Sequence, residues 1–591
     1  MGLSFVSLLG GDATKYGFDK RDLTEGKKRT GKLRFDEGPE AAIGILPRQG
    51  DFAALEKESI TKILDFCPKS FVLETEVVKP GWIKDNLSRR AGRSYSIFTR
   101  IVGDRAVSIG VRKDLADSFS PLELFPNVGE SFRTVARRMT AALSNPLLKD
   151  VVINDLIDTH GLTETEKLVE FIKENKSGLG FASLSRLAEL ANEDRELQEA
   201  FFTNKTLITE MAKAFPEIPG ETIRILEPSV GSGAFIPFLA KIYGAKKNVE
   251  ITAVDISSRA NAALKELLKW MELPTNIHVE CICEDFLEMD IKPKFDLVVG
   301  NPPFSKSIKG TKLESYRSKA FNKKAMNTSA FFLERALKLA DKVVMVMPKF
   351  LLNTPEFKDT RLLLSDKSVD TIIDFGEKGF GGVLIETIAL RIDPKAKPGN
   401  TAVISVTENE AFLNPQSYLT SSEFPYWLIY RDTFFDKVRA KLDLGIFDAF
   451  RDRQITTGML GRSGIRVLKS RNLNDDGTVI LDILGYDAYI SEDIAKNLAI
   501  FRYLDNSSAY MAPNMTYNPR LARKPKGVLV NGSVALLILK DGQPPLTDEE
   551  MRFISSNEYR SFYKIARNRQ SRSLNIDSSS IFFFGRLKKR R

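Results

Sequence analysis

The chain has 591 residues, 43% of them hydrophobic, and a formal net charge of +10 at pH 7. This length predicts about three domains, and the charge has the sign expected of a protein that binds a polyanion. With 3 cysteines and no apolar stretch as long as a membrane span, the sequence excludes a disulfide-rich secreted protein and an integral membrane protein. Its start lacks a charged leader, and we expect a cytoplasmic protein.

The first 200 residues predict an auxiliary α+β region, for which DNA clamping is the role we expect. Apolar and polar residues alternate there as in antiparallel strands, and helical periods follow. The expected strands are residues 71–78, 93–100 and 105–112, and the expected helices are residues 162–173 and 182–190.

A nuclease is an alternative interpretation of the same region. It would need clustered carboxylates with a lysine on a strand to hold a metal ion. Glu74, Glu76 and Lys79 match that pattern poorly, so a helper domain is the preferred interpretation.

A glycine motif follows a short apolar strand that begins at Ile223. The strand ends in Glu227 and Pro228, and Gly231 and Gly233 follow at the start of a predicted helix. Glycines allow close approach of a ligand to the backbone, and the amino end of a helix offers free N–H groups. The acid would repel a pyrophosphate but suits a cation such as S-adenosylmethionine, whose ammonium and sulfonium are both positive. A glycine turn after a strand can also be purely structural.

Two further strands are predicted to end in acids. Residues 249–256 end in Asp255 and Ile256, and an acid at this strand tip can accept hydrogen bonds from both ribose hydroxyls. Residues 277–283 lead to Asp285 and Phe286, which could hold the amino group and the ring of an adenine. The alternative for Asp285 is a helix cap.

The fourth strand, residues 295–300, runs into Asn301, Pro302, Pro303 and Phe304. Neither proline can donate a backbone hydrogen bond and both have a fixed φ, so this corner is stiff and presents only acceptors. The Asn301 side-chain oxygen and the Pro302 carbonyl could take both hydrogens of a planar amine, and the Phe304 ring offers a stacking face. Asn-Pro is also a common way to open an ordinary turn.

In this order the motifs resemble the gamma class of adenine-N6 DNA methyltransferases of restriction–modification systems. Phe202-Thr203 resembles the family's first cofactor segment, with Asn204 where proline is usual, and residues 379–388 resemble its last catalytic motif. The resemblance implies an α/β, Rossmann-like S-adenosylmethionine-dependent catalytic domain. It assigns cofactor contacts to Thr203, Glu227, Pro228, Gly231, Gly233, Asp255, Ile256, Asp285, Phe286 and Asn301, and catalysis to Asn301, Pro302, Pro303, Phe304 and Phe380.

The implied reaction is methyl transfer to a flipped-out adenine. Rotating a base out of a duplex costs a few kcal/mol, and stacking on Phe304 and Phe380 would offset part of that cost. Acceptance of both amine hydrogens favours a pyramidal nitrogen aimed at the methyl group. Positioning and fixed dipoles then suffice, so neither a metal nor a general base is expected.

The proline- and glycine-containing segment 393–399 predicts a linker between a catalytic domain, residues 201–393, and a target-recognition domain, residues 400–591. Residues 454–458, followed by residues 464–472, are similar to segments of target-recognition domains in related methyltransferases and specificity subunits. Basic residues are clustered late in the chain and suit phosphate contacts, with a solvated surface as the alternative. They are Arg520, Arg523, Lys524 and Lys526, then Lys564, Arg567, Arg569 and Arg572, then Arg586, Lys588, Lys589, Arg590 and Arg591.

Double-stranded DNA is the expected partner of a monomeric enzyme that protects host DNA, with a separate cognate endonuclease as a further partner. An RNA or protein-glutamine N-methyltransferase remains an alternative, because those enzymes use the same corner for the same chemistry. A DNA-binding subunit without activity would not need the cofactor motifs.

Overall fold

The computed structural model describes residues 4–7, 41–46, 70–75, 95–102, 105–112, 150–175, 179–192, 205–245, 247–271, 273–292, 295–377, 385–514, 516–571 and 575–588. Thr203 and Phe380, two of the expected site residues, lie outside these ranges. The chain divides into two compact units. The first comprises Met1–Glu193, Gly231–Gly233 and Ser258–Leu273, and the second Asp194–Val230, Ala234–Ser257 and Pro274–Arg591.

The first unit begins with a five-stranded sheet of order β1-β2-β3-β5-β4. Strands β2 and β3 are parallel, and the other neighbouring pairs are antiparallel. The three strands expected from alternation correspond to β3, β4 and β5. The bounds are Ser4–Ser7 for β1, Ala41–Leu46 for β2, Ser70–Thr75 for β3, Tyr95–Val102 for β4 and Arg105–Arg112 for β5.

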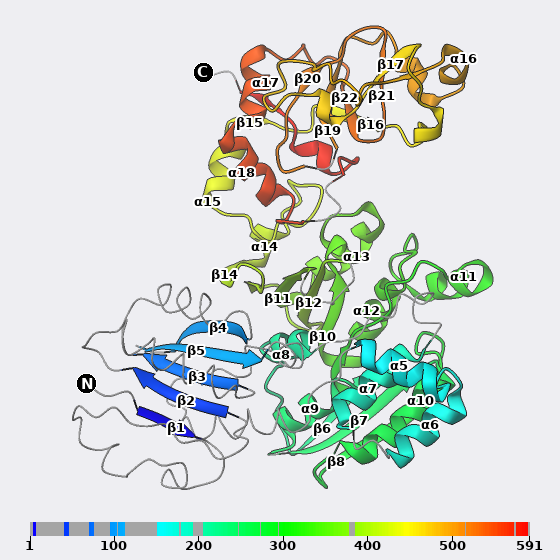
Figure 1. The fold of residues 1–591 in the computed structure, drawn as a ribbon, viewed down its shortest axis with the longest axis vertical. Helices are drawn as coiled ribbons and strands as arrows, with labels where there is room; N and C mark the ends of the chain where they lie inside the picture. The colour runs from blue at the N-terminus through cyan, green and yellow to red at the C-terminus, as the bar shows by residue number, and fades with distance from the viewer. Residues whose placement is uncertain are drawn as a thin grey trace. The chain divides into compact units, whose positions relative to one another are not determined.

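Four helices of the first unit share an apolar core. Helices α6 and α7 match the two helical periods expected from the sequence, and α10 packs against both. Leu168, Leu184 and Leu267 are fully buried between them. The helices are α5 (Asp150–His160), α6 (Thr165–Glu174), α7 (Phe181–Leu190) and α10 (Ser258–Leu267), drawn cyan to green in Figure 1.

The second unit is built on a nine-stranded sheet of order β14-β13-β11-β12-β10-β9-β6-β7-β8. The five strands from β8 to β10 are parallel, and most of their apolar side chains are buried, as is typical of a sheet covered on both faces. Their bounds are Thr222–Glu227 for β6, Asn248–Asp255 for β7, Ile277–Cys283 for β8, Phe295–Gly300 for β9 and Ala340–Pro348 for β10.

The remaining four strands continue the sheet beyond β10. Strand β12 lies antiparallel to both β10 and β11, β11 is parallel to β13, and β14 closes the edge antiparallel to β13. Because β13 and β14 follow residues 393–399, the sheet continues past the linker expected there. The bounds are Ser368–Gly376 for β11, Thr387–Asp393 for β12, Asn400–Ser405 for β13 and Glu410–Pro415 for β14.

Helices cover this sheet (Figure 1). Helix α12 packs on β9 and β10, α9 on β7, and α8 and α13 on β11. Helix α12 begins where Asn327 caps it, accepting a hydrogen bond from the Ser329 N–H at 3.1 Å. The bounds are Lys205–Ala212 for α8, Ile236–Tyr243 for α9, Gly310–Lys319 for α11, Thr328–Leu339 for α12, Lys358–Ser365 for α13 and Gln416–Leu419 for α14.

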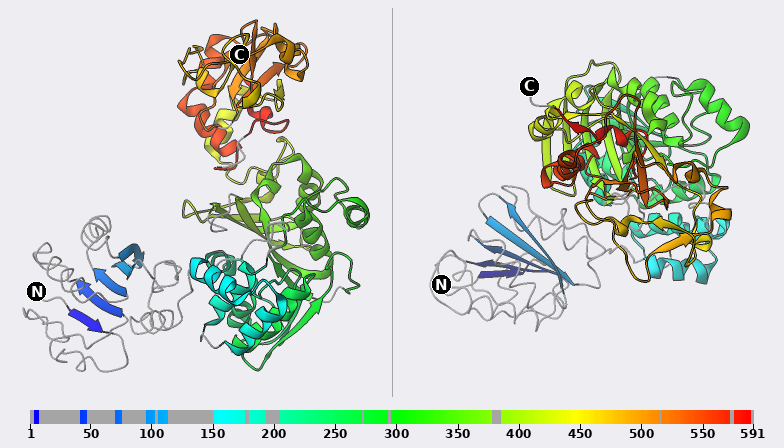
Figure 2. Two further views of the ribbon diagram at one scale, coloured as in Figure 1. Left: turned by 45° about the vertical axis from the view of Figure 1, so that its right-hand side comes forward. Right: turned by 90° about the horizontal axis from the view of Figure 1, so that it is seen from above.

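The C-terminal segment of the second unit has small sheets of its own, drawn yellow to red in Figure 2. Their orders are β16-β22-β19-β20, β18-β17-β21 and β15-β23. The strands are β15 (Leu442–Asp443), β16 (Phe447–Arg451), β17 (Ile465–Leu468), β18 (Ala488–Ile490), β19 (Ala509–Pro513), β20 (Ala522–Arg523), β21 (Val528–Val530), β22 (Val534–Leu539) and β23 (Arg586–Leu587). The helices are α15 (Thr433–Ala440), α16 (Glu492–Ala495), α17 (Asp548–Ile554) and α18 (Asn557–Ala566).

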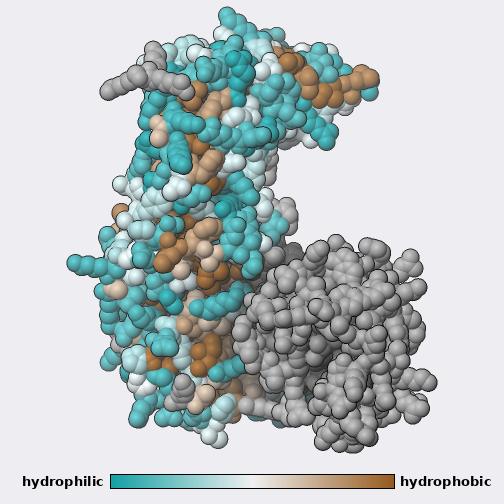
Figure 3. Space-filling view, turned by 90° about the vertical axis from the view of Figure 1, so that its left-hand side faces the viewer, coloured by the Kyte–Doolittle hydropathy of each residue, from teal (hydrophilic) through white to brown (hydrophobic). Residues whose placement is uncertain are grey.

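Stacked aromatic rings hold α15 to α18, with the Phe435 and Phe562 centroids 4.6 Å apart. The space-filling view in Figure 3 shows a largely hydrophilic face interrupted by hydrophobic areas. Across the described parts of the chain, no helix combines the length and hydropathy needed to cross a bilayer.

Candidate functional site

Parallel strands bring four of the expected site positions to one sheet edge. Strands β8, β7, β6 and β9 are consecutive neighbours, so their carboxyl ends share an edge. Glu227 ends β6, Asp255 ends β7, Asp285 follows β8 and Asn301 follows β9. After β6, the chain adds β7 and β8 on one side of that strand and then β9 and β10 on its other side. The carboxyl end of β6 is therefore a topological switch point, where open α/β sheets bind ligands.

The Asn301 corner lies directly against the turn that follows β6. A Cβ atom added to Gly300 would stand 3.1 Å from Pro228 Cδ, closer than ordinary contact. The Ser229 hydroxyl donates a hydrogen bond to the Asn301 carbonyl at 3.2 Å. A glycine at the end of β9 therefore allows the two motifs to touch, and the hydrogen bond fixes their separation.

Glu227 is a buried carboxyl group whose Oε2 atom lacks a hydrogen-bond partner. The residue is 1% exposed. Burial, with a smaller contribution from the nearby Asp255 carboxylate, raises its pKa well above the ordinary value. A buried acid of this kind is costly without a compensating cation, so its chemistry fits a positively charged ligand such as S-adenosylmethionine.

The glycines of the same motif belong to the first unit, through contacts with α7. Gly231 and Gly233 have φ values of 52° and 79°, which glycine adopts without strain. Between them, Ser232 shares a 2.7 Å hydrogen bond with Ser185 and donates another of 2.8 Å to Glu189. The turn is thus held in a left-handed conformation by side chains from one helix.

Asp255 and Ile256 together present a polar and an apolar group at the tip of β7. Asp255 Oδ1 accepts a hydrogen bond from the Ser257 N–H at 2.9 Å, which orients the carboxylate. The Ile256 side chain is 54% exposed, unusually high for an isoleucine next to a buried strand. An acid beside an open apolar surface suits a ribose and its attached ring.

Asp285 already has donors on both carboxylate oxygens. The Leu287 N–H donates to Oδ1 at 3.0 Å. Asp285 therefore makes the side-chain-to-backbone hydrogen bond expected of a cap, but in a local turn. The Tyr316 hydroxyl donates to Oδ2 at 2.6 Å, and Lys312 Nζ lies 3.0 Å from the same atom. Burial would raise the pKa of Asp285, but the hydrogen bonds from Tyr316 and Lys312 outweigh it and lower the pKa.

Phe286 packs inward. Its ring is 2% exposed and lies 5.1 Å from that of Phe332 on α12, with the Arg335 guanidinium 5.3 Å from its centre. Contact with an adenine ring, expected from the sequence, therefore stays a prediction.

The corner formed by residues 301–304 is anchored by the start of α12. Asn327 Nδ2 donates to the Phe304 carbonyl at 2.6 Å, and the Thr328 N–H donates to the Ser305 carbonyl at 2.9 Å. Pro302 is buried, and the Phe304 ring is 1% exposed. The open stacking face expected of Phe304 is thus covered in this structure, and stacking of a base requires the covering side chains to move.

Sequence reasoning missed several of these supporting residues, among them Gly300, Lys312, Tyr316 and Asn327. Only Gly300, the last residue before Asn301, carried a local signal. The other three come from α11 and the start of α12, which are brought to the site by the fold.

The late basic residues divide between the interior and the surface. Arg523, Lys526, Lys564 and Lys588 are exposed, so phosphate contact stays a prediction for them, and Arg572, Lys589, Arg590 and Arg591 lie outside the described residues. Three others are buried, which corrects their interpretation as phosphate contacts. Arg520, Lys524 and Arg567 are 9%, 2% and 2% exposed. Lys524 Nζ donates to the Leu504 carbonyl at 2.7 Å, and Arg569 pairs with Glu410 at 2.9 Å. These cations stabilise the fold because their donors are used by carbonyls and carboxylates.

No group of three or more histidine, cysteine or acidic side chains within the described ranges is placed to hold a metal ion.

Comparison with known proteins agrees with the geometry. Residues 240–380 match the family described as Eco57I restriction-modification methylase. The chain is 28% identical over 177 residues to the type II methyltransferase M.CvrRI of Paramecium bursaria Chlorella virus XZ-6E, covering 30% of this chain and 43% of that protein. The chain thus spans less than half the length of this relative. These matches support a methyltransferase of the restriction–modification type.

Solved structures to which the chain is similar include a putative class I S-adenosylmethionine-dependent methyltransferase from Listeria monocytogenes, with a TM-score of 0.33 and 10% identity over 47% of this chain and 80% of that one. The type IIG restriction endonuclease BpuSI aligns with a TM-score of 0.40 and 12% identity over 89% of this chain and 81% of that one. The strand order of the nine-stranded sheet itself confirms the α/β methyltransferase fold expected from the sequence.

Proposed function

We propose that this chain is a site-specific DNA adenine-N6 methyltransferase that uses S-adenosylmethionine and protects host DNA in restriction–modification. The observation that carries the proposal is the contact between the Asn301 corner and the Glu227 turn, through Gly300 and the Ser229 hydrogen bond. The Asn301 corner, which offers only acceptors to an amine, therefore lies next to the turn that carries Glu227, a buried acid suited to a cation.

Each residue of the site has a role that follows from its position. Glu227 neutralises positive charge on the bound cofactor, Asp255 takes its ribose hydroxyls and Asp285 its adenine amine. The Asn301 side-chain oxygen and the Pro302 carbonyl accept the two hydrogens of the target amine, which turns the nitrogen lone pair toward the donor. When bound, S-adenosylmethionine supplies a methyl group on a good sulfonium leaving group.

Proton movement needs no dedicated base in this proposal. The target amine would gain the methyl group and lose one proton, and the bond from the methyl group to the cofactor's sulfur would be the bond that breaks. The N-methylated nitrogen is acidic while it still carries both protons, and it releases one of them to water. Hydrogen bonds from Asn327 and Thr328 to the Phe304 and Ser305 carbonyls hold the end of the corner in place, which favours a fixed geometry of its acceptors.

Sequence recognition is assigned to the C-terminal part. The connection from β16 to β17 is exposed over residues 456–458 and 461–464, and Arg453 and Arg462 are exposed within it. Gly458 and Gly461 have open space around them, so a phosphate or base could approach their backbone. We assign DNA contact to this connection, auxiliary clamping to residues 1–200, and a monomeric, cytoplasmic state to the enzyme, with restriction by a separate endonuclease.

The second candidate is methylation of RNA or of a protein glutamine, since the corner chemistry would be the same. Incubation of the full chain with labelled S-adenosylmethionine and duplex DNA, tRNA, rRNA or a release factor separates the candidates. Label in duplex DNA at adenine N6 is the expected result. Label confined to RNA or protein would reject the proposal.

A further inference from the structure

Helix α11 is attached along one side to the loop that follows β8. Ser315 donates to Glu288 Oε1 at 2.7 Å, Lys319 pairs with the same carboxylate, and Tyr316 and Lys312 both reach Asp285. These four side chains recur at helical spacing on one face of α11. Helix α11, which follows the Asn301 corner in the chain, is therefore held against the loop that contains Asp285 and Glu288.

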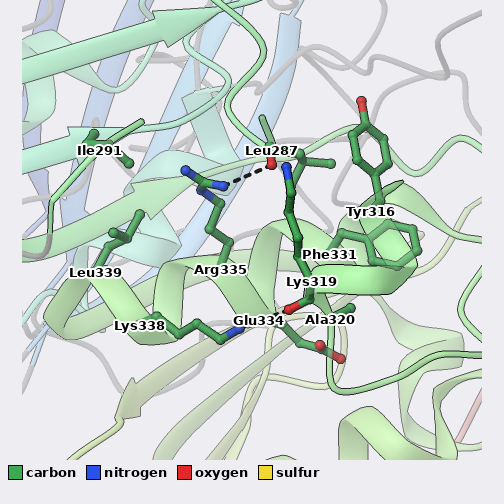
Figure 4. Close-up of a pocket in the computed structure, with 10 residues that line it drawn as sticks. All are labelled: Leu287, Ile291, Tyr316, Lys319, Ala320, Phe331, Glu334, Arg335, Lys338 and Leu339. Carbon is green, nitrogen blue, oxygen red and sulfur yellow. Dashed lines mark hydrogen bonds between the residues drawn. The ribbon is translucent and has the colours of Figure 1, made fainter. Parts of the chain in front are cut away.

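Tyr316 is held firmly in this position. Its side chain is 4% exposed, and its ring packs 5.8 Å from Phe331 of α12. Figure 4 shows Tyr316 and Phe331 together on the wall of a cavity of about 190 Å³, with Arg335 donating to the Leu287 carbonyl. Burial and the hydrogen bond to Asp285 raise the pKa of Tyr316, so its hydroxyl stays protonated and serves as a donor.

The donors leave little acceptor capacity on Asp285. Each carboxylate oxygen has two lone pairs. Oδ2 receives both Tyr316 and Lys312, and Oδ1 receives the Leu287 N–H. One acceptor position remains, on Oδ1, and three donors prevent the carboxylate from rotating to offer another.

We propose that Tyr316 and Lys312 are specificity-determining positioning residues, which fix Asp285 so that its one remaining acceptor position selects a purine with a 6-amino group in the cofactor site. This rests on the proposed function, because it takes the ligand of that edge to be the cofactor's adenosine. A 6-oxo purine would place its oxygen against an ionised carboxylate that has no proton to donate. A site built around one required hydrogen bond rejects a ligand that lacks the donor.

The test compares two ligands that differ only at that atom. Dissociation constants of S-adenosylhomocysteine and its 6-oxo analogue, S-inosylhomocysteine, are measured by calorimetry for the full chain and for Tyr316→Phe and Lys312→Met. The natural chain should prefer the amino form by at least about 100-fold. Tyr316→Phe should reduce this preference about tenfold, since one hydrogen bond to a charged group is lost. Lys312→Met should reduce it in the same direction.

Lys319→Met is the matched control, because Lys319 lies on the same helix and contacts Glu288 instead of Asp285. It should leave the preference unchanged. If Tyr316→Phe and Lys312→Met weaken both ligands equally, the two residues are merely structural and the inference is overturned. If the natural chain binds neither ligand nor S-adenosylmethionine, it is the proposed function that fails. Because Lys312 is half exposed, its variant should fold even if Tyr316→Phe does not.

Discussion

Lys349 Nζ lies 2.8 Å from Asp374 Oδ2, and both side chains are only 2% exposed. The pair joins the end of β10 to the end of β11, two strands separated in the sheet by β12. Glu386 Oε1 is 3.4 Å from the same ammonium, and the Tyr430 hydroxyl donates to Asp374 at 2.5 Å. A buried charged network therefore connects the ends of β10 and β11.

Lys349→Met should destabilise the protein strongly, because it leaves two buried carboxylates without their cation. The expected loss in free energy of unfolding is about 3–5 kcal/mol, measured by urea denaturation. Lys342→Met is the control, since Lys342 pairs with Asp393 while 32% exposed, and should cost under about 1 kcal/mol. A loss for Lys349→Met no larger than the control's would show that the network contributes little.

Glu227 should make cofactor binding depend on pH. Its pKa is raised in the folded protein by burial and by Asp255, and a bound cation lowers it again, so binding releases a proton. Affinity for S-adenosylmethionine should then rise as the pH increases above the ordinary pKa of 4.5, until the raised pKa is passed. Calorimetry in buffers of different ionisation enthalpy measures the released proton.

Without cofactor, the effect of Glu227 on the free energy of unfolding should depend on pH in the opposite direction. With a folded pKa above the unfolded one, Glu227 binds more protons when folded, so its contribution to stability falls as the pH rises through that window. Glu227→Gln should remove both effects, whereas Glu221→Gln, at an exposed carboxyl, should keep them. If Glu227→Gln still released the same number of protons on binding cofactor, the proton would come from another group.

Asn301→Ala should abolish transfer and leave cofactor affinity nearly unchanged. The lost acceptor acts on the target amine in the transition state, and removal of one preorganised group of this kind costs about 100- to 1000-fold in kcat. Single-turnover methylation of duplex DNA measures the rate, and calorimetry measures the affinity. Loss of cofactor binding in proportion to activity would contradict the role assigned to Asn301.

Phe304→Ala separates packing from base capture. The ring is 1% exposed, so its removal should cost about 3–5 kcal/mol of stability. If the ring also stacks on the everted base, the fluorescence increase of 2-aminopurine at the target position should be reduced. A stable variant with an unchanged fluorescence increase would show that Phe304 has only a packing role.

The sequence was sufficient for four of the five parallel strands, β6 to β9, and for the acids that follow three of them, because each is encoded by a local apolar run followed by a polar residue. It did not predict β10. It could not reveal that Phe304 and Phe286 turn inward, since the covering side chains come from distant parts of the fold. The same reason explains two of the late basic residues: Arg567 and Lys524 look like surface charge in the sequence, but they are buried donors to carbonyls. Strand β13 was missed as part of the sheet because a proline–glycine turn precedes it.

Gly300→Ala tests the contact between the Asn301 corner and the turn that follows β6. The added Cβ would stand 3.1 Å from Pro228 Cδ and 3.7 Å from Ser229 Oγ, so the corner must shift by a few tenths of an ångström. Such a displacement should lower kcat for methylation about tenfold or more, since productive geometry is sensitive on this scale, while the protein stays folded. Gly399→Ala is the control, because nothing lies within 4 Å of the added atom. Rates of both variants are compared under single-turnover conditions at saturating cofactor. Equal rates for the two would mean that the spacing between Asn301 and the Glu227 turn does not limit transfer.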